Sequence, residues 1–260
     1  MSHVSRSTHV FPLHFHDDLY AIGLMRQGAS HCLGPKHDRD TVRQGQACLI
    51  NPGQVHSGVP VESAISYTML YLHVDLVRSL AEDVSQTPGC CPEFTDLICA
   101  HPGLVSSLHH LAGVLHSPES LATDTTLIRT LGDLLQIHGG LRPPRGGKDP
   151  RFVKQAKEVL RANLESKIGL KDMSAALGVS QYYFVRLFKR LTGVPPHVYR
   201  TQRRVELART LIRRSLPLSD IAQAAGFTDQ SHLTNTFKLY TGTTPGQYAR
   251  LLKLQHPEIP

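Results

Sequence analysis

Residues 218–248 of this chain read LSDIAQAAGFTDQSHLTNTFKLYTGTTPGQY, and residues 170–199 read LKDMSAALGVSQYYFVRLFKRLTGVPPHVY. The two stretches match at an offset of 48 in their first part and of 49 in their second, so the later copy has one extra residue between Phe227 and Leu233. An internal repeat of this kind indicates a duplicated structural unit. The matching positions are Leu170/Leu218, Asp172/Asp220, Ala176/Ala224, Gly178/Gly226, Phe188/Phe237, Lys189/Lys238, Thr192/Thr241, Gly193/Gly242, Pro196/Pro245 and Tyr199/Tyr248.

Each copy has the pattern of a short helix, a turn that contains glycine, and a longer helix. Gly178 and Gly226 stand where the first helix must end and the chain must reverse, which favours a left-handed backbone that glycine adopts at little cost. Ser180 in the first copy, and Thr228 or Asp229 in the second, supply a side-chain oxygen to cap the next helix. This is the helix-turn-helix pattern, in which the second helix enters the major groove of DNA.

The charge of the chain is unevenly distributed. Residues 148–260 hold 19 lysines and arginines against 8 acids, a net charge of +11, whereas residues 1–147 hold 9 against 13, a net charge of −4. Only the second half therefore has the electrostatics of a polyanion binder. One glycine-turn helix pair also occurs in bundles that bind nothing, but two copies in a basic domain favour specific binding to successive major grooves of one duplex.

Residues 151–254 resemble the DNA-binding domain of the AraC/XylS family of bacterial regulators. The resemblance is carried by Ala175–Ser180 (AALGVS), Phe184–Lys189 (FVRLFK), Ile221–Phe227 (IAQAAGF), and Phe237-Lys238 followed by Thr241–Pro245 (TGTTP). It implies a one-component transcription regulator, and activation through contact with RNA polymerase rather than repression.

Positions between the apolar residues of each second helix are the candidates for DNA contact, because the apolar ones must face the domain core. Arg186 suits a guanine, Gln230 or Asn235 suits an adenine, and Lys189 and Lys238 suit phosphates. A solvated helix surface is the alternative for each. The candidates are Gln181, Tyr182, Val185, Arg186 and Lys189 in the first copy, Gln230, Ser231, Thr234, Asn235 and Lys238 in the second, and Arg203 and Arg204 on the joining helix, for the DNA backbone.

The part of the chain before this region differs in composition and in the spacing of its apolar residues. Residues 139–147, GGLRPPRGG, favour neither a helix nor a central strand, and predict a linker. Short apolar runs between turn residues within 9–75 predict the strands of a β-barrel or sandwich. Leucines at helical spacing in 103–116 and 121–138 predict a helical hairpin, packed either on the barrel or on a second subunit.

Two histidine-containing stretches stand within the predicted strands. His14-Phe15-His16, and the segment from Gly45 to Asn51-Pro52-Gly53-Gln54-Val55-His56, resemble the two signature stretches of the cupin barrel, which is also an effector-binding domain in AraC/XylS regulators. Residues two apart on a strand share a face, so His14 and His16 are expected to point together, with His56 approaching from an opposing strand. Three histidines around one cavity suit a divalent metal.

Three interpretations of these histidines stay open: contact with a small effector, a bound divalent metal, or hydrogen bonds at strand edges. The glutamate that enzymatic cupins carry after the second histidine is replaced by Tyr20, so Asp17, Asp18 or water would have to complete a metal site. We predict no resident cofactor, with a divalent metal at the three histidines as the alternative. The predicted effector pocket consists of His14, His16, Tyr20, Gln54, His56 and Tyr71.

Several classes of protein are disfavoured. No apolar run is long enough to cross a membrane, and the first residues lack the apolar core of a signal peptide, so we expect a cytoplasmic protein. The cysteines are odd in number and include no C-x-x-C pair, so we expect reduced thiols. No nucleophile-and-base constellation or phosphate loop is apparent, so we do not expect an enzyme.

The sequence therefore predicts an α+β chain of two domains that acts as a ligand-responsive transcription factor. A metal-dependent cupin enzyme with an appended regulatory domain, and a constitutive DNA-binding protein whose barrel only dimerises, are the other hypotheses. Expected partners are a double-stranded DNA operator, a small-molecule effector, RNA polymerase and, as an alternative for the hairpin, a second copy. The expected organisation is a cupin-like β-barrel at 1–100, a helical hairpin at 101–138, a linker at 139–150, and an all-α domain with two helix-turn-helix motifs at 151–254.

Overall fold

A computed structural model gives the structure of the chain and describes residues 1–33, 39–61, 64–115, 120–142, 150–162, 164–165 and 168–255. Contacts divide the chain into two units. The first contains residues 1–119, 126–147 and 180–183, and the second contains residues 120–125, 148–179 and 184–260.

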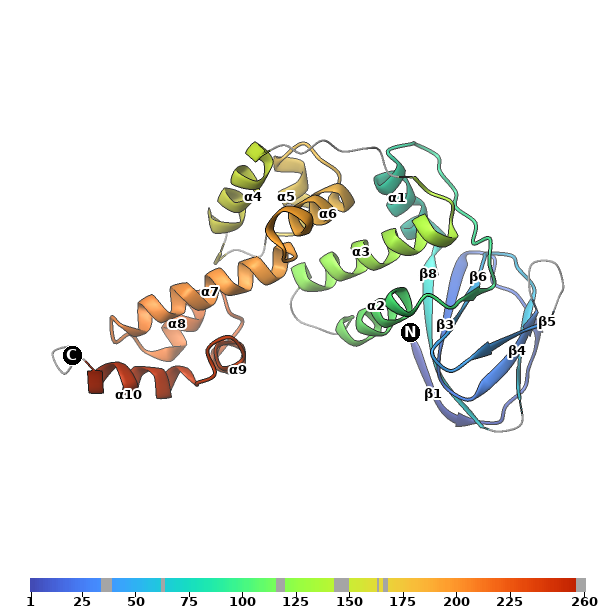
Figure 1. Cartoon of the computed structure of the whole chain (residues 1–260), viewed down its shortest axis with the longest axis horizontal. Helices are drawn as coiled ribbons and strands as arrows, with labels where there is room; N and C mark the ends of the chain where they lie inside the picture. Colours follow the sequence, from blue (N-terminus) through green and yellow to red (C-terminus); the bar gives the residue numbers. More distant parts are fainter. Residues whose placement is uncertain are drawn as a thin grey trace. The chain divides into compact units, whose positions relative to one another are not determined.

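The first unit contains two antiparallel β-sheets (Figure 1). The five-stranded sheet has the order β1-β8-β3-β6-β9, with β1 at Ser2–Ser7, β8 at Ile65–His73, β3 at Leu19–Gln27, β6 at Ala47–Ile50 and β9 at Ile98–Cys99. The four-stranded sheet has the order β2-β7-β4-β5, with β2 at Phe11–His14, β7 at His56–Pro60, β4 at Ala29–Leu33 and β5 at Arg39–Arg43.

Strand β3 lies at the centre of the larger sheet. It pairs with β6 and β8 in registers that place Ala21 opposite both Ile50 and Tyr71. Its apolar run does not alternate with polar residues because both faces of the strand are buried. Gly23 and Met25 face the cavity between the sheets, and helix α2 (Pro102–Val114) contacts the same strand.

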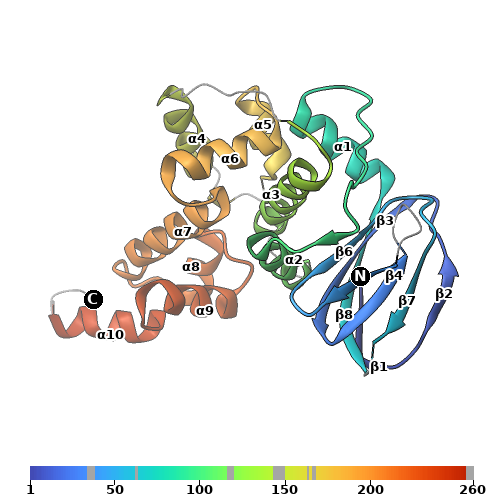
Figure 2. The same cartoon turned by 45° about the vertical axis from the view of Figure 1, so that its right-hand side comes forward.

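The expected barrel is present as two facing sheets (Figure 2). Among the strands of the described part of the chain, no backbone pairing joins one sheet to the other. Residues of both sheets nevertheless line one cavity, so the sheets enclose a common interior. This arrangement gives the first unit an internal site without closure of the hydrogen-bond network.

Helices follow the sheets, as the leucine spacing predicted. Helix α1 (Val74–Ser85) continues directly from β8, and its first turn is capped by His73 Nδ1, which accepts from the Asp75 backbone N–H at 3.3 Å. Helix α2 buries Leu104, Leu108 and Leu111, and helix α3 (Ser120–His138) buries leucines on one face. The predicted linker at 139–150 falls largely on residues 143–149, which lie outside the described residues.

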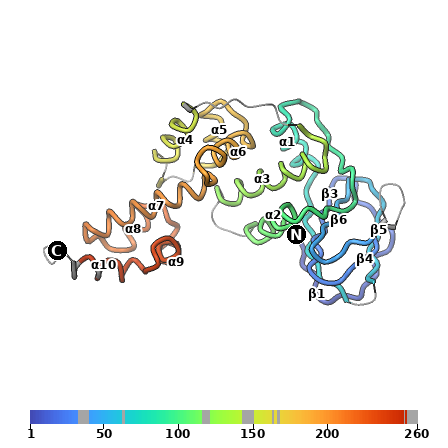
Figure 3. Tube along the Cα trace, viewed as in Figure 1, coloured from blue at the N-terminus to red at the C-terminus, as the bar shows by residue number. Residues whose placement is uncertain are grey.

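The described part of the second unit is all helical, as predicted (Figure 3). Its helices are α4 at Pro150–Ala162, α5 at Leu170–Ala176, α6 at Gln181–Thr192, α7 at Pro196–Ile212, α8 at Leu218–Ala224, α9 at Gln230–Thr241 and α10 at Pro245–Gln255. Helix α7 joins the two sequence repeats and contacts α4, α8, α9 and α10. No described helix of the chain is long and apolar enough to span a bilayer.

Candidate nucleic-acid interface and effector cavity

The sequence repeat is also a repeat of local structure. Gly178 after α5 and Gly226 after α8 have φ of 64° and 79°, the left-handed conformation expected at these turns. Ser180 Oγ accepts from the Tyr183 N–H at 3.1 Å, and Asp229 Oδ1 accepts from the His232 N–H at 2.7 Å. The hydrogen bond from His232 lowers the pKa of Asp229, which therefore stays ionised at the N-terminus of α9.

The ends of the second helices are built alike as well. Thr192 Oγ1 donates to the Phe188 carbonyl at 2.8 Å, and Thr241 Oγ1 donates to the Phe237 carbonyl at 2.8 Å. The phenylalanine ring of each copy then packs on a tyrosine of the following helix, with ring centroids 5.6 Å apart for Tyr199 and 5.5 Å apart for its counterpart. Two equivalent helix-turn-helix units therefore stand within the C-terminal half.

Helix α9 has a buried face and an open face. Leu233 and Phe237 are fully buried, which fixes the rotation of the helix about its axis. The other face carries all the residues predicted for DNA contact in the second copy. Gln230, Ser231, Asn235 and Lys238 are exposed, and Thr234 is half-buried with its hydroxyl donating to the Gln230 carbonyl at 2.8 Å.

Helix α6 presents a smaller open surface than the sequence predicted. Arg186 and Lys189 are exposed and Gln181 is half-buried. Val185, however, is fully buried, since it lies three residues before Phe188 and extends the apolar stripe of the helix. The prediction that Val185 touches a base is therefore wrong for this structure.

Tyr182 is likewise buried, with 3 % of its surface exposed. It belongs to residues 180–183, which are grouped with the first unit, and its hydroxyl donates to Asp133 Oδ1 at 3.1 Å. Tyr182 and Val185 are three residues apart, so they share one side of the helix. Tyr182 is therefore not an open position for DNA contact in this structure.

The two arginines predicted to contact the DNA backbone from α7 have different environments. Arg204 is 5 % exposed, and its Nε donates to the Leu164 carbonyl at 2.9 Å. Arg200, which is not among the predicted site residues, is also buried and donates to the Ile168 carbonyl at 3.2 Å. Arg203 is half-buried and pairs with Glu206.

Arg204 is therefore a structural residue, and its assignment to DNA was wrong. Arg200 and Arg204 are four residues apart and share one side of α7, where they satisfy carbonyl groups of the segment between α4 and α5. The sequence contains the signal, because the same spacing continues to Ala208, which is fully buried. Extending the buried stripe of α7 backwards would have identified both arginines.

A cavity of about 210 Å³ lies between the sheets of the first unit. Gly23 keeps space for sulfur atoms at its wall, since a Cβ there would lie 2.6 Å from Cys48 Sγ and 2.9 Å from Met69 Sδ. No disulfide joins the cysteines of the described chain, and two of them, Cys32 and Cys48, line the cavity. The lining residues include Phe11, His14, His16, Met25, Cys32, Val42, Cys48, Ile50, His56, Ile65, Tyr67, Met69 and Tyr71.

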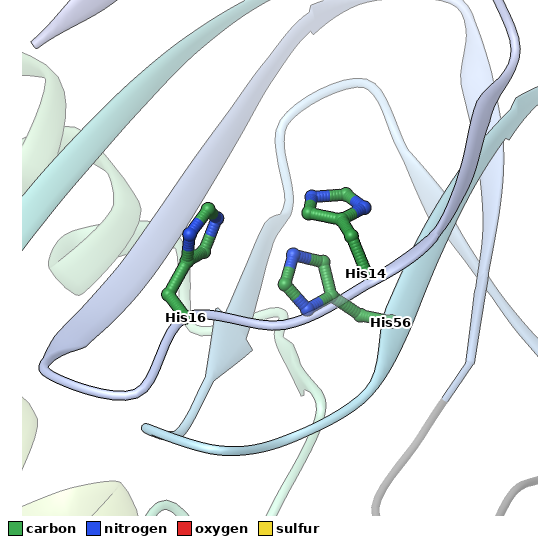
Figure 4. Close-up of side chains that lie close together, drawn as sticks. All are labelled: His14, His16 and His56. Carbon is green, nitrogen blue, oxygen red and sulfur yellow. The ribbon is translucent and has the colours of Figure 1, made fainter.

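His14, His16 and His56 lie together at this cavity (Figure 4). His14 of β2 stands opposite His56 of β7 in the strand register, and His16 follows β2 directly. One ring nitrogen of each residue lies within 4.8 Å of the others. Burial lowers the pKa of His56, so its ring is held neutral near neutral pH.

The other predicted pocket residues are divided. Tyr71 lines the cavity, with its ring 5.6 Å from that of His16. Tyr20 does not, because its hydroxyl donates to the Pro92 carbonyl at 2.6 Å on the opposite face of β3, and burial raises its pKa. Gln54 also lies outside the lining set, and its Oε1 accepts from the Asn51 N–H at 3.0 Å.

Comparison with known proteins gives two family matches in this chain. Residues 2–131 match the family model for an AraC-like ligand binding domain, and residues 173–251 match a helix-turn-helix domain. YbfI of Bacillus subtilis (strain 168), an uncharacterized HTH-type transcriptional regulator, is 26 % identical over 226 residues, which cover 86 % of this chain and 81 % of that protein.

Two further similarities each cover less than half of this chain. The multiple antibiotic resistance protein MarA of Escherichia coli (strain K12) is 35 % identical over 112 residues, which are 43 % of this chain and 87 % of MarA. The solved C-terminal domain of AraT, a response regulator from Geobacillus stearothermophilus, is 28 % identical, covers 40 % of this chain and 86 % of its own, and gives a TM-score of 0.38.

Proposed function

This chain belongs to the AraC family of helix-turn-helix transcriptional regulators, and we propose that it binds a specific operator through both motifs under the control of a small molecule held between its two sheets. The family consists of regulators and not of enzymes, so the hypothesis of a cupin enzyme is set aside. The observation that carries the proposal is the duplication, within a half of net charge +11, of one complete helix-turn-helix unit.

The open face of α9 is the proposed reader of one half of the operator. Its amide side chains, Gln230 and Asn235, can each make two hydrogen bonds to an adenine, while Ser231 and Thr234 adapt to either base. Arg186 is the proposed reader in the first copy, and Gln181 lies at the start of that helix. Lys189, Lys238 and Arg203 are the proposed phosphate contacts, because each is a flexible or partly open cation beside a reading surface.

The proposed regulation uses the cavity of the first unit. An effector that binds one conformation better than another shifts the population that is competent for the operator. By family resemblance, we propose that the bound regulator activates transcription through RNA polymerase. Self-association through the helical hairpin is the proposed alternative role of α2 and α3. A purified transcription assay with polymerase and an operator template measures the sign of regulation directly.

Footprinting of the full-length protein on selected operators tests the proposal. Two bound helices on one face of the duplex protect two patches about 10–10.5 base pairs apart, because successive major grooves are separated by one helical turn. Protection of a single patch, unchanged when α9 residues are replaced, would contradict the use of both motifs. Unchanged operator affinity across a metabolite screen would instead support the constitutive alternative.

We expect Arg186→Ala to weaken binding to the best operator by about 1–3 kcal/mol and to relax selection at one base position, since a bidentate contact to guanine is lost. Affinities for every single-base variant of the operator measure the effect. Arg190→Ala, which removes an exposed arginine of the same helix outside the candidate set, is the matched control. A uniform loss on all sequences would show that Arg186 contacts only a phosphate.

We expect Lys238→Ala to lower affinity nearly equally for all sequences and to reduce the salt dependence of binding by roughly one counterion. The measurement is the slope of log affinity against log salt concentration. Lys154→Ala removes an exposed lysine of α4, outside both motifs, and should leave the slope unchanged. An unaltered slope for Lys238→Ala would exclude a phosphate contact at this position.

A further inference from the structure

We propose that His14, His16 and His56 together bind one divalent transition-metal ion, through Nε2 of His14 and His56 and one ring nitrogen of His16, and that the effector is an oxygen-donor ligand of that ion. This inference rests on the proposed function, because it concerns the same cavity. It goes further by naming the chemistry that recognises the effector. His14 of β2 stands opposite His56 of β7, His16 lies two residues after His14, and the three rings lie close together (Figure 4).

The spacing of the three side chains suits one ion. One ring nitrogen from each lies within 4.8 Å of the other two. Metal–imidazole bonds of about 2.0–2.1 Å place ligand nitrogens roughly 3–3.5 Å apart, so small side-chain rotations complete the set. The ring centroids of His14 and His56 are only 4.2 Å apart. The ring centroid of His16 lies 5.3 Å from that of His14 and 5.5 Å from that of His56.

The hydrogen bonds of two rings fix which nitrogen is available. His14 Nδ1 lies 2.8 Å from the Pro12 carbonyl, and His56 Nδ1 lies 2.9 Å from the Gln54 carbonyl. Since a carbonyl oxygen only accepts, each Nδ1 carries a proton, so the tautomer that binds a metal has its lone pair on Nε2. Backbone carbonyls orient ligating histidines in this way in metal sites. A role in strand-edge hydrogen bonding alone would leave both Nε2 atoms without a use.

A site made of three neutral histidines would supply no negative charge to balance the charge of the ion. Among the described residues, only the three histidines form this cluster, and the position of the cupin glutamate holds Tyr20, which is turned to the Pro92 carbonyl. Asp18, one of the acids predicted to complete a metal site, has its Oδ2 3.6 Å from Nε2 of His73. Three neutral imidazoles suit zinc, cobalt, nickel or iron and leave coordination positions open.

The open positions would face a cavity with mostly apolar walls, which include Met25, Val42, Ile50 and Ile65. An ion of charge +2 in such surroundings attracts an anionic oxygen donor strongly, because the local dielectric constant is low. The walls select an apolar body behind that donor, and the cavity of about 210 Å³ limits its size. The class of effector that fits is a small monocarboxylate with a short aliphatic or aromatic body.

Cobalt titration of the full-length, chelator-treated protein tests the metal site. Visible absorption should show one equivalent of Co²⁺ bound, and elemental analysis should give one equivalent of metal after loading. His14→Gln and His56→Gln should each weaken binding by about 100-fold or more, since even outer-shell changes cost 10–100-fold. His31→Gln is the matched control, because His31 is half-buried on β4 and bonds Thr41 Oγ1 at 2.8 Å away from the cluster.

The same cobalt spectrum tests the effector class. Adding acetate, butyrate, hexanoate or benzoate to the loaded protein should shift the absorption bands, at lower concentrations for the ligands with larger apolar bodies. Circular dichroism of each variant verifies that it is folded. Absence of stoichiometric cobalt binding, or equal binding by the histidine variants and His31→Gln, would overturn the metal site. Cobalt absorption bands that do not shift on addition of any of these carboxylates would overturn the proposed effector class.

Operator footprinting on the same preparations separates this inference from the proposed function. Normal operator protection without metal binding overturns the metal site and leaves the regulator intact. Metal binding without operator protection does the reverse.

Discussion

Gly226→Ala is expected to destabilise the second unit by more than about 3 kcal/mol, whereas Gly178→Ala, at the equivalent turn of the first copy, should cost about 1–2 kcal/mol. Both glycines have positive φ, so an alanine at either position is strained. At Gly226 the new Cβ would also lie 2.1 Å from the Leu164 carbonyl oxygen and 2.9 Å from Arg204 Nε. At Gly178 nothing lies within 4 Å.

The difference between these two variants is informative because their sequence contexts are repeats of each other. A clash with a backbone carbonyl cannot be relieved by a rotamer change, so the segment that contains Leu164 must move and the Arg204 hydrogen bond must lengthen. Urea unfolding followed by circular dichroism, together with operator affinity, measures both effects. Equal losses for Gly178→Ala and Gly226→Ala would show that only backbone strain matters and that the packing against Leu164 does not.

The second large effect is expected at Arg204. Arg204→Ala should lower the free energy of unfolding by about 2–4 kcal/mol, because the Leu164 carbonyl loses a charged donor and a buried side chain is removed. Arg203→Ala, one residue earlier, should change stability by no more than about 0.5 kcal/mol, because its pairing with Glu206 is at a partly exposed surface.

For operator affinity the order of the two effects should be reversed, so that Arg203→Ala has the larger effect and Arg204→Ala the smaller. Arg203→Ala is expected to weaken binding to all sequences, as the loss of a phosphate contact does. Arg204→Ala, measured at a low temperature where the protein stays folded, should bind with nearly normal affinity. A strong, sequence-independent loss for folded Arg204→Ala would restore the original assignment of this residue to the DNA backbone.

The helix-turn-helix architecture was predictable because its determinants are local. Glycine turns, capping side chains and apolar stripes lie within a few residues of one another, and a repeat displays each of them twice. Val185 and Arg204 were assigned to the surface although both continue a buried stripe, Val185 with Phe188 and Arg204 with Ala208. The stripe does not give the partner of Arg204, because the Leu164 carbonyl lies 40 residues earlier in the chain.

The cavity illustrates the same limit within a sheet. Strand alternation placed His14 and His16 together correctly, and proximity to a motif then suggested Tyr20. On β3, however, Gly23 and Met25 face the cavity, so alternation turns Tyr20 to the other face. Which of the two faces is internal depends on the second sheet, whose residues come from other parts of the chain. Cys48 and Met69 were missed for that reason.

Helix α7 is a continuous helix of 17 residues between the two reading units, and it spans about 25 Å. Two buried arginines of α7 bind carbonyl groups of the segment between α4 and α5. Helices α8, α9 and α10, which belong to the second repeat, also contact α7. A continuous helix of this kind holds the two reading units at a fixed separation, which cannot increase when bases are inserted between the halves of an operator. If both motifs bind one operator, as proposed, operators that gain or lose half a turn of duplex between their two halves should lose affinity for the protein, so the spacing of the halves should vary less among target promoters than their base sequence.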